Sequence, residues 1–409
     1  MRIDNHGHPL VSLDPHEQTL LESVRELVAT KIGPQANAVG RDENFAWETF
    51  RQLANAGVIA TAFPREHGGS DASMLLRVLI IEEIARCCGT AASIVTGTEL
   101  SSRAIVAGGS AALRAQWLPH LATGKRQSAF ALTEPGAGSD LAGLTTIAER
   151  SAGGYRISGR KKFITRAGVA DCMVVTARLA DAPPGARGLS AFLVESTCAG
   201  LTVSPDIPKA GWHGVPANEV TFDKVEVPAS QLLGTEGAGM ALAQDTLVRA
   251  RIGHAAIALG RMAGALQIAA QYTNHRKVGG VAVGEHQGIR WMLAGMATKI
   301  EAARCQIYAC ALRYDRDATN SEVPLFASMA KLHSTDLCMK VVIDCLQLLG
   351  GNGYLRAYPL ERFMRDAKMN QIGEGTSEIH KNLIGRAVVR TAAAMPQHPC
   401  LDFEPDLFD

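Results

Sequence analysis

The feature that most constrains the fold of this chain is its hydrophobic periodicity, which changes twice along 409 residues. Up to about Gln127, apolar residues recur every three or four positions, which is typical of amphipathic helices. From there to about Leu233, short β-rich runs alternate with glycine and proline turn signals. Helical spacing then returns and continues to about Ala394. Because helices and strands are segregated along the chain, the pattern favours an α+β protein over alternating βαβ units.

We expect three domains. They are an N-terminal helical domain at 1–126, a middle antiparallel β domain at 127–233 and a C-terminal four-helix bundle domain at 234–409. The strands of the middle domain are predicted at 154–158, 161–165, 172–178, 189–195 and 219–227. Four long apolar-periodic segments usually form a bundle. These segments are predicted at 238–275, 285–314, 321–349 and 377–394.

Charge and composition exclude several classes of protein. Forty-one Lys and Arg residues stand against forty Asp and Glu, so the formal net charge of +1 favours neither nucleic acid nor an anionic membrane as partner. No apolar run reaches the roughly 18 residues of a membrane span, and the first residues have no targeting pattern. Nine cysteines without a CxxC pattern predict reduced, buried thiols in a cytoplasmic protein. No His, Cys and Asp cluster has metal-ligand spacing, so we expect no metal.

A glycine-rich loop, TEPGAGSD at 133–140, follows the start of the β-rich region. The backbone N–H groups of such a loop can point at one anion or carbonyl. An ordinary surface turn explains the same composition equally well. The pair Lys161-Lys162 lies in a predicted hairpin, and we interpret both side chains as exposed.

Glu374 stands between two glycines, directly before an apolar-periodic helix. Flanking glycines let the backbone approach a ligand, and the helix N-terminus supplies N–H groups and a positive dipole. For Glu378 we favour a structural role as a first-turn acid, with Thr376 or Ser377 as the N-cap. A structural role of this kind explains Glu374 less well, because acids at a helix start rarely need a glycine on both sides. We therefore predict Glu374 to be a functional carboxylate.

Two other patterns have two interpretations each. Gly350-Gly351, one turn after Gln347, predicts either a tight corner between helices or a close approach of backbone to a ligand. Arg251 and Arg276 lie within and at the end of the first bundle segment. Each is either a solvated helix cation, which near a helix C-terminus is favourable by itself, or a contact to an anionic ligand.

Taken together, these motifs resemble the acyl-CoA dehydrogenase family, in the family's order and over nearly the whole chain. The matching segments are TEPGAGSD at 133–140, KKFIT at 161–165, HQ at 286–287, QLLGGNG at 347–353, and MRDAK followed by IGEGTSEI up to Ile379. The resemblance implies a homotetramer that holds FAD between the β domain and the bundle. It also implies α,β-dehydrogenation of an acyl-CoA thioester to trans-2-enoyl-CoA, with electrons passed to an electron-transferring flavoprotein.

The resemblance implies the site residues as well. Glu374 matches the catalytic base, whose backbone N–H and a ribityl hydroxyl of FAD hold the thioester oxygen in the family; Ala250 occupies the alternative base position of some relatives. The residues expected at FAD are Phe130, Leu132, Thr133, Ser139, Phe163, Thr165, Arg276, Gln287, Gln347, Gly350, Gly351, Thr376 and Glu378. Among these, Arg276 and Gln287 are expected from a neighbouring subunit. The residues expected at the acyl-CoA are Ser139, Arg251, Gly375 and Arg386.

Other functions fit parts of the sequence. An oxygen-using flavoenzyme, either an oxidase or a monooxygenase, is possible on the same scaffold, although monooxygenase relatives generally lack the glutamate. A non-catalytic helical binding protein is the third interpretation. The acyl group, and the choice between CoA and a carrier protein, are left open.

We interpret Glu99 and Arg103, one helical turn apart, as a surface ion pair; the alternative is that Glu99 faces the acyl group.

Overall fold

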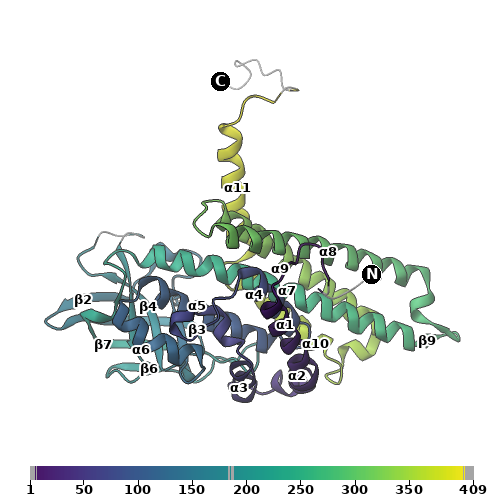
Figure 1. Ribbon diagram of the computed structural model, residues 1–409, viewed down its shortest axis with the longest axis horizontal. Helices are drawn as coiled ribbons and strands as arrows, with labels where there is room; N and C mark the ends of the chain where they lie inside the picture. Colours follow the sequence, from purple (N-terminus) through teal and green to yellow (C-terminus); the bar gives the residue numbers. More distant parts are fainter. Residues whose placement is uncertain (1–4, 6, 183–184, 186–187, 399, 401–409) are drawn as a thin grey trace.

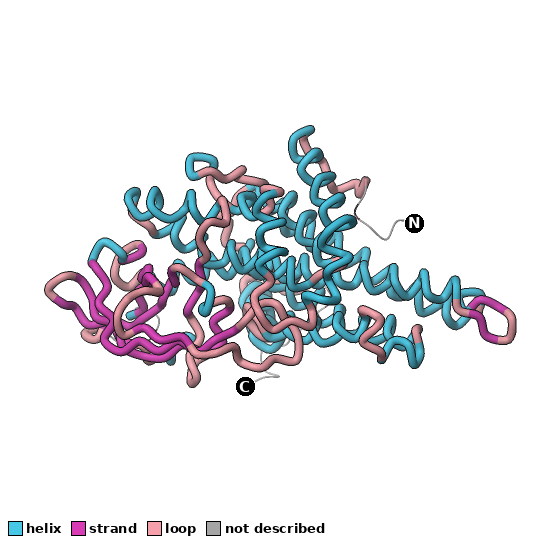
Figure 2. Tube along the Cα trace, turned by 90° about the horizontal axis from the view of Figure 1, so that it is seen from below, coloured by secondary structure: helices cyan, strands magenta, loops and turns pink. Residues whose placement is uncertain are grey.

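The computed structural model describes residues 5, 7–182, 185, 188–398 and 400. Most of the strands gather at one end of an elongated molecule, and long helices extend from them to the opposite end (Figure 1). Figure 2 shows the same separation of strands and helices from below. Among the described residues, no helix combines the length and the apolar character that crossing a membrane requires.

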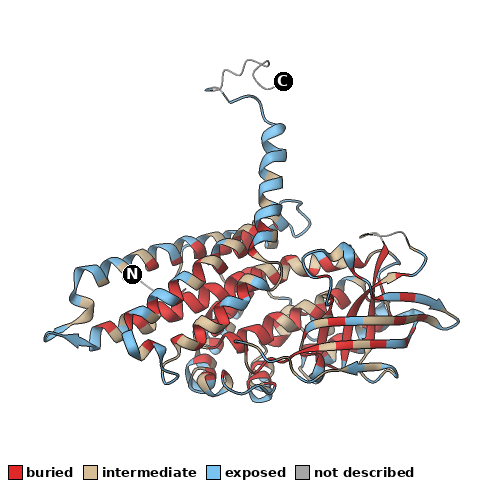
Figure 3. Ribbon diagram, turned by 180° about the vertical axis from the view of Figure 1, so that it is seen from behind, coloured by how far each residue is buried: buried red, intermediate tan, exposed pale blue. Residues whose placement is uncertain are grey.

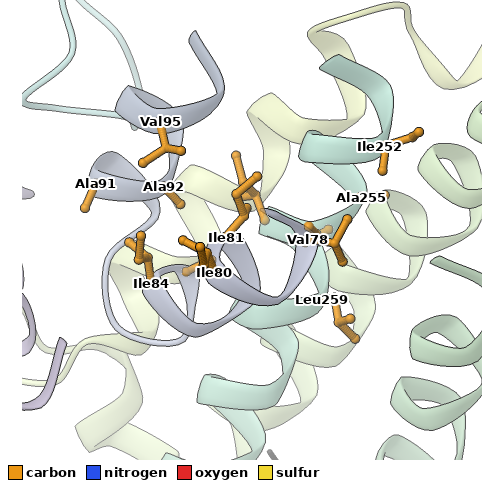
Figure 4. Packing of buried hydrophobic residues seen from close by; sticks show 14 of the residues in the cluster. Val78, Ile80, Ile81, Ile84, Ala91, Ala92, Val95, Ile252, Ala255 and Leu259 are labelled. Carbon is orange, nitrogen blue, oxygen red and sulfur yellow. The ribbon is translucent and has the colours of Figure 1, made fainter. Parts of the chain in front are cut away.

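The N-terminal part is helical, as predicted. Its helices are α1 (Pro15–Leu27), α2 (Gly33–Val39), α3 (Trp47–Asn55), α4 (Met74–Ala85), α5 (Gly89–Gly108) and α6 (Ala111–Ala122). Ser73 caps α4 by accepting the N–H of Leu76, an interaction that the orphan donors of a helix start require. Every residue of α4 is buried. Figure 4 shows the reason: Val78 of α4 lies beside Ala255 and Leu259 of the long C-terminal helix α7 (Gly239–His275).

The middle part is a single mixed sheet. Its strands are β1 (Ser128–Ala131), β2 (Ile147–Ser151), β3 (Gly154–Thr165), β4 (Cys172–Leu179), β5 (Leu189–Glu195), β6 (Leu201–Val203), β7 (Ala217–Pro228) and β8 (Leu232–Leu233). They lie in the order β6-β7-β3-β2-β4-β5-β8, and β1 pairs with β4. Most pairs are antiparallel, but β1 and β2 each run parallel to β4, so the predicted antiparallel pairing does not hold there.

The C-terminal part is the predicted helical domain. It contains α7 (Gly239–His275), α8 (Gln287–Arg316), α9 (Val323–Leu348), α10 (Leu360–Ile372) and α11 (Ser377–Ala393), with the short hairpin β9 (Lys277–Val278) and β10 (Val281–Ala282) between α7 and α8. Helix α10, which was not predicted from the sequence, packs on α9 and α7. Only the start of α11 is buried, and the rest of the helix projects from the body with exposed side chains (Figures 1 and 3).

Glu99 is not part of a surface pair with Arg103. Its side chain is buried between α4, α5 and α7, where it contacts the guanidinium of Arg77 and accepts a 2.6 Å hydrogen bond from Arg249. Arg103 instead pairs with Asp245 at 2.7 Å. The i,i+4 spacing predicted the wrong partner because α7 offers closer charges to both side chains. Glu99 therefore serves as a buried link between three helices.

The exposure of the cysteines also differs in part from the prediction. All nine thiols are free, and Cys88, Cys172, Cys310, Cys338 and Cys345 are buried. Cys87 and Cys198 are half-buried, whereas Cys305 and Cys400 are exposed. The prediction of buried thiols is wrong for the last two, since one lies on the outer face of α8 and the other near the C-terminus.

Replacing Glu99 by Gln should lower the free energy of unfolding by about 3 kcal/mol, because the buried guanidinium of Arg77 and the half-buried one of Arg249 would lose the carboxylate that they share. Chemical denaturation measures the change. Glu22→Gln, on the exposed face of α1, is the matched control and should change stability by less than about 0.5 kcal/mol. Equal stability of the two variants would contradict the structural role of Glu99.

Candidate functional site

The centre of the candidate site is a bend between α10 and α11. Gly373 donates its N–H to the carbonyl of Met369 at 2.9 Å and so ends α10. Glu374 follows with φ +57° and Gly375 with φ +101°, and Thr376 then caps α11 by accepting the N–H of Ile379. A left-handed glutamate is strained, and strain of this kind concentrates at functional sites. Thr376 is the N-cap that the sequence predicted as one of two candidates.

Two cationic side chains hold the far side of this bend. Arg251 of α7 donates to the carbonyl of Glu374 at 3.4 Å, and Lys331 of α9 donates to the carbonyl of Gly375 at 2.6 Å. Burial raises the pKa of the Glu374 carboxyl, and the charges of Arg251 and Lys331 oppose part of that rise. Arg251 is therefore no solvated helix cation. The bend presents a half-buried carboxyl that is more basic than one in water.

Two neutral histidines flank the same bend. A Cβ built on Gly373 would lie 3.3 Å from the ring of His254, and one on Gly375 would lie 3.1 Å from Nε2 of His380. Burial, followed by the charge of Lys331, lowers the pKa of both imidazoles to about 3. The glycines are thus needed because side chains crowd the bend on both sides.

The TEPGAGSD loop is pinned to the sheet by a buried ion pair. Lys161 is 0% exposed and donates to Glu134 at 2.9 Å and to the carbonyl of Leu132 at 3.0 Å. Burial alone would raise the pKa of Glu134, but Lys161 and hydrogen bonds from Thr145 and Thr146 lower it to about 2. The prediction that Lys161 is exposed is therefore wrong, because the loop folds over it; its neighbour is half-buried.

Phe163 is an exposed aromatic residue in an uncommon conformation. It lies in β3 at a register shift against β7, with φ +59° and 58% of its surface exposed. Lys162 donates its backbone N–H to the carbonyl of Thr133 at 2.8 Å, which brings the strand against the glycine-rich loop. The Lys162 ammonium lies 5.3 Å from the centroid of this ring, and a strained backbone of this kind concentrates at functional sites.

A second group of predicted residues lies at the distant end of α7. Arg276 is the C-cap of this helix and is exposed, and Gln287 begins α8 just beyond the β9–β10 hairpin. The end of α9 meets the same region, because Asn352 donates to Tyr272 in the last turn of α7 at 2.8 Å. The 37 residues of α7 span about 55 Å. Figure 1 shows the sheet at the opposite end of this helix.

Gly350 and Gly351 form the predicted glycine corner at that distant end. Gly350 has φ +57°, and a Cβ on either glycine would meet no atom within 4 Å. Gln347 precedes them in the last turn of α9. These glycines therefore leave the backbone open to a ligand instead of packing against a neighbouring helix.

The remaining predicted residues differ in exposure. Leu132 is buried, whereas Phe130, Thr133 and Thr165 are half-buried. Ser139 is exposed in the glycine-rich loop, and Arg386 is exposed on the projecting part of α11. A depression of about 200 Å³ contains Thr376 and Glu378. Its full lining is Asp336, Lys368, Gln371, Ile372, Thr376, Ser377, Glu378 and Lys381.

Several polar groups around the bend were not predicted from the sequence. Lys331, His254 and His380 were not singled out, although Lys331 interrupts an apolar-periodic segment, which is a signal for a buried charge. Trp212 was also missed; its ring lies 5.6 Å from that of His254 and it takes φ +56°. Sequence spacing did not reveal that four separate elements converge there.

Another cluster brings His8, Glu301 and Cys305 within 4.8 Å of one another. Nδ1 of His8 accepts the N–H of Leu10 at 3.2 Å, so a neutral ring carries its proton on Nε2 and donates it to Glu301 at 3.0 Å. A metal-bound histidine would instead donate from its second nitrogen. The cluster is therefore better explained as a hydrogen bond that fastens the N-terminal segment to α8.

Comparison with protein families assigns each part of the chain. Residues 14–125 match the acyl-CoA dehydrogenase N-terminal domain, residues 129–225 the middle domain and residues 237–389 the C-terminal domain. Together these matches cover most of the chain in the order α, β, α.

Individual proteins agree with this assignment. An acyl-CoA dehydrogenase from Bacillus subtilis is 37% identical over 90% of this chain and 97% of its own length. The structure of butyryl-CoA dehydrogenase from Megasphaera elsdenii has a TM-score of 0.88 and 33% identity, covering 93% of this chain and 100% of that one. A glutaryl-CoA dehydrogenase from Mycobacterium smegmatis in complex with FADH2 has a TM-score of 0.87 and 26% identity, covering 94% and 97%.

Glu134→Gln should destabilise the protein by about 3 kcal/mol at neutral pH, because the Lys161 ammonium would remain buried without its carboxylate. The lowered pKa of Glu134 means that its contribution is present above the ordinary carboxyl pKa and is lost as the pH falls toward about 2. Denaturant melts of both proteins at several pH values measure this. Glu149→Gln, exposed on β2, is the control; a pH-independent difference from wild type would contradict the ionic explanation.

Proposed function

This chain belongs to the acyl-CoA dehydrogenase family, and we propose that Glu374 is the base with which it oxidises an acyl-CoA thioester. Such enzymes are oxidoreductases that act on CH–CH bonds, and the reaction yields trans-2-enoyl-CoA. The observation that carries the proposal is the left-handed Glu374, whose half-buried carboxyl has a raised pKa between two glycines. A base must have a pKa near the working pH to remove a proton efficiently.

The carboxylate and the backbone N–H of Glu374 have different roles in removal of the α-proton. The carboxylate of Glu374 takes the proton from the α-carbon of the thioester, while its own backbone N–H faces the oxygen on which negative charge develops. Arg251 and Lys331 stay outside this step. They hold the two carbonyls that follow the base, so the Cα of Glu374 keeps one orientation. Glycine is favoured at 375 because the residue has φ +101° and a Cβ there would lie 3.1 Å from Nε2 of His380.

The residues present fit FAD as the cofactor. Phe163 offers its exposed ring, and Phe130, Leu132, Thr133, Ser139 and Thr165 lie on β1, β3 and the glycine-rich loop between them. Thr376 and Glu378 border the depression at the start of α11. Bound FAD supplies the acceptor for the hydride that leaves the β-carbon. The protein residues orient the two reacting carbons and exclude water.

We further propose that the cofactor site is shared between subunits of a homotetramer. Arg276, Gln287, Gln347, Gly350 and Gly351 lie about 55 Å along α7 from the sheet, which is too far for them to serve the same flavin as Phe163. An exposed α11 with Leu383, Val388 and Val389 on its surface supports association of subunits, since large apolar side chains are rarely left in water together.

The remaining assignments follow from the family. Ser139 and Arg386, both exposed, would contact the CoA part of the substrate together with Arg251 and Gly375. An electron-transferring flavoprotein would reoxidise the enzyme in the cytoplasm.

We propose domain boundaries at 126/127 and 233/234, which fall in the loops between α6 and β1 and between β8 and α7. The acyl group is to be identified by anaerobic titration of the bound flavin with short, medium, branched and aromatic acyl-CoAs.

Glu374→Gln should retain bound FAD but lose reduction of the flavin by acyl-CoA, because an amide cannot accept the α-proton. In the wild type, the rate of reduction should rise with pH through the raised pKa of Glu374, since the base works only when unprotonated. Stopped-flow bleaching of the flavin measures both effects. Glu322→Gln, an exposed glutamate directly before α9, should keep most of the rate; bleaching by the Glu374 variant would contradict the assignment.

Arg276→Ala should weaken FAD binding although Arg276 is remote from Phe163 in its own chain. We expect an increase of about tenfold in the dissociation constant, the loss of one charge-assisted contact to a phosphate. Equilibrium dialysis of FAD against the apoprotein measures it. Arg316→Ala, at the far end of α8, is the control, and unchanged affinity in both variants would contradict the shared site.

A further inference from the structure

We propose that Lys331 is a positioning residue, whose bond to the Gly375 carbonyl fixes the direction in which Glu374 presents its carboxylate and N–H. The inference rests on the proposed role of Glu374. It concerns a side chain on α9 that does not touch the reacting atoms itself. Lys331 is 0% exposed, and the only hydrogen bond recorded for its ammonium within the described residues is that to Gly375 at 2.6 Å.

The bend is anchored before and after the glutamate. On the upstream side, the N–H of Gly373 is bonded to Met369 at the end of α10. On the downstream side, the carbonyls of Glu374 and Gly375 are held by Arg251 and Lys331. The bond from Lys331 is the shorter of these two by 0.8 Å. Because the left-handed φ of Glu374 is intrinsically unfavourable, such a conformation persists only where the surroundings impose it.

Burying the Lys331 ammonium costs desolvation free energy, which a neutral donor to the same carbonyl would avoid. This cost argues for a functional reason. Burial lowers the pKa of Lys331 to about 8, so the side chain is still protonated at neutral pH. The groups that face it are Glu374, Arg251, Asp336, Glu378, His254 and His380. Both histidines stay neutral. Lys331 therefore adds a positive charge beside the base as well as a hydrogen-bond donor.

These two roles predict different changes in the pH profile. The charge of Lys331 favours the ionised carboxylate, so its removal should move the acidic limb of kcat to higher pH. The resulting decrease in kcat is confined to low pH and disappears at a pH where Glu374 is again unprotonated. The loss of the donor should instead lower kcat at every pH, because the bend relaxes and the base is misplaced. Only the second effect reports positioning.

The experiment compares Lys331→Met, which lacks both charge and donor, with Lys331→Gln, which lacks the charge but keeps a donor. We expect both to retain FAD and to shift the acidic limb alike. The plateau of kcat at high pH should fall about tenfold or more in Lys331→Met, with KM changed less, and should be partly restored in Lys331→Gln. Lys340→Met, exposed on the same helix, should match the wild type.

Full recovery of the Lys331→Met plateau at high pH would overturn the inference, since the role would then be that of a charge alone. A measurement independent of catalysis separates this result from failure of the proposed function. Amide hydrogen exchange at residues 373–376 should become about tenfold faster in Lys331→Met, because a local hydrogen bond restrains that segment. Unchanged exchange would also overturn it, whether or not acyl-CoA reduces the wild-type flavin.

Discussion

A carboxyl group that leaves water without a full complement of partners becomes harder to ionise, and the geometry around Glu374 depends on this fact. Burial raises its pKa, while the charges of Arg251 and Lys331 limit the rise. The two cations bond to main-chain carbonyls instead of closing on the carboxylate. The carboxylate oxygens of Glu374 are therefore available to another group. The carboxylates of Glu134 and Glu99 are instead engaged in buried ion pairs, which gives them structural roles.

Helix α7 relates the parts of the site to one another. Its first turns pack near β5, its middle supplies Arg251 and His254, and its last turn meets the end of α9. The N-terminal helices α4 and α5 pack along the same helix (Figure 4). A buried helix of this length has apolar residues on all sides, which accounts for the small alanine and glycine side chains along it. Small residues let neighbouring helices approach closely.

Much of the fold could be predicted from periodicity, since the α, β, α order and the long helices are properties of local sequence. The candidate site was singled out in part: Glu374 was noticed because of its glycines, and Thr376 was predicted as an N-cap because it precedes a helix. Partners across the fold were not predictable. Lys161 resembled a hairpin lysine and Glu99 a surface acid, yet each pairs with residues that are 22 or more positions away in the sequence. The parallel pairing of β1 with β4 likewise depends on contacts between distant segments.

The separation of Phe163 from Arg276 has a consequence for mixed assemblies. If each flavin site is formed by two subunits, one subunit supplies the half with Phe163 and Glu374 and the other supplies the half with Arg276. Two inactive variants can then be altered in different halves of the site. A chain altered at Glu374 can still lend its Arg276 to a neighbour, and a chain altered at Arg276 can still contribute its own Glu374. Co-assembly of the two would regenerate intact centres, so defects in the two different halves would complement one another, whereas two defects in the same half would not.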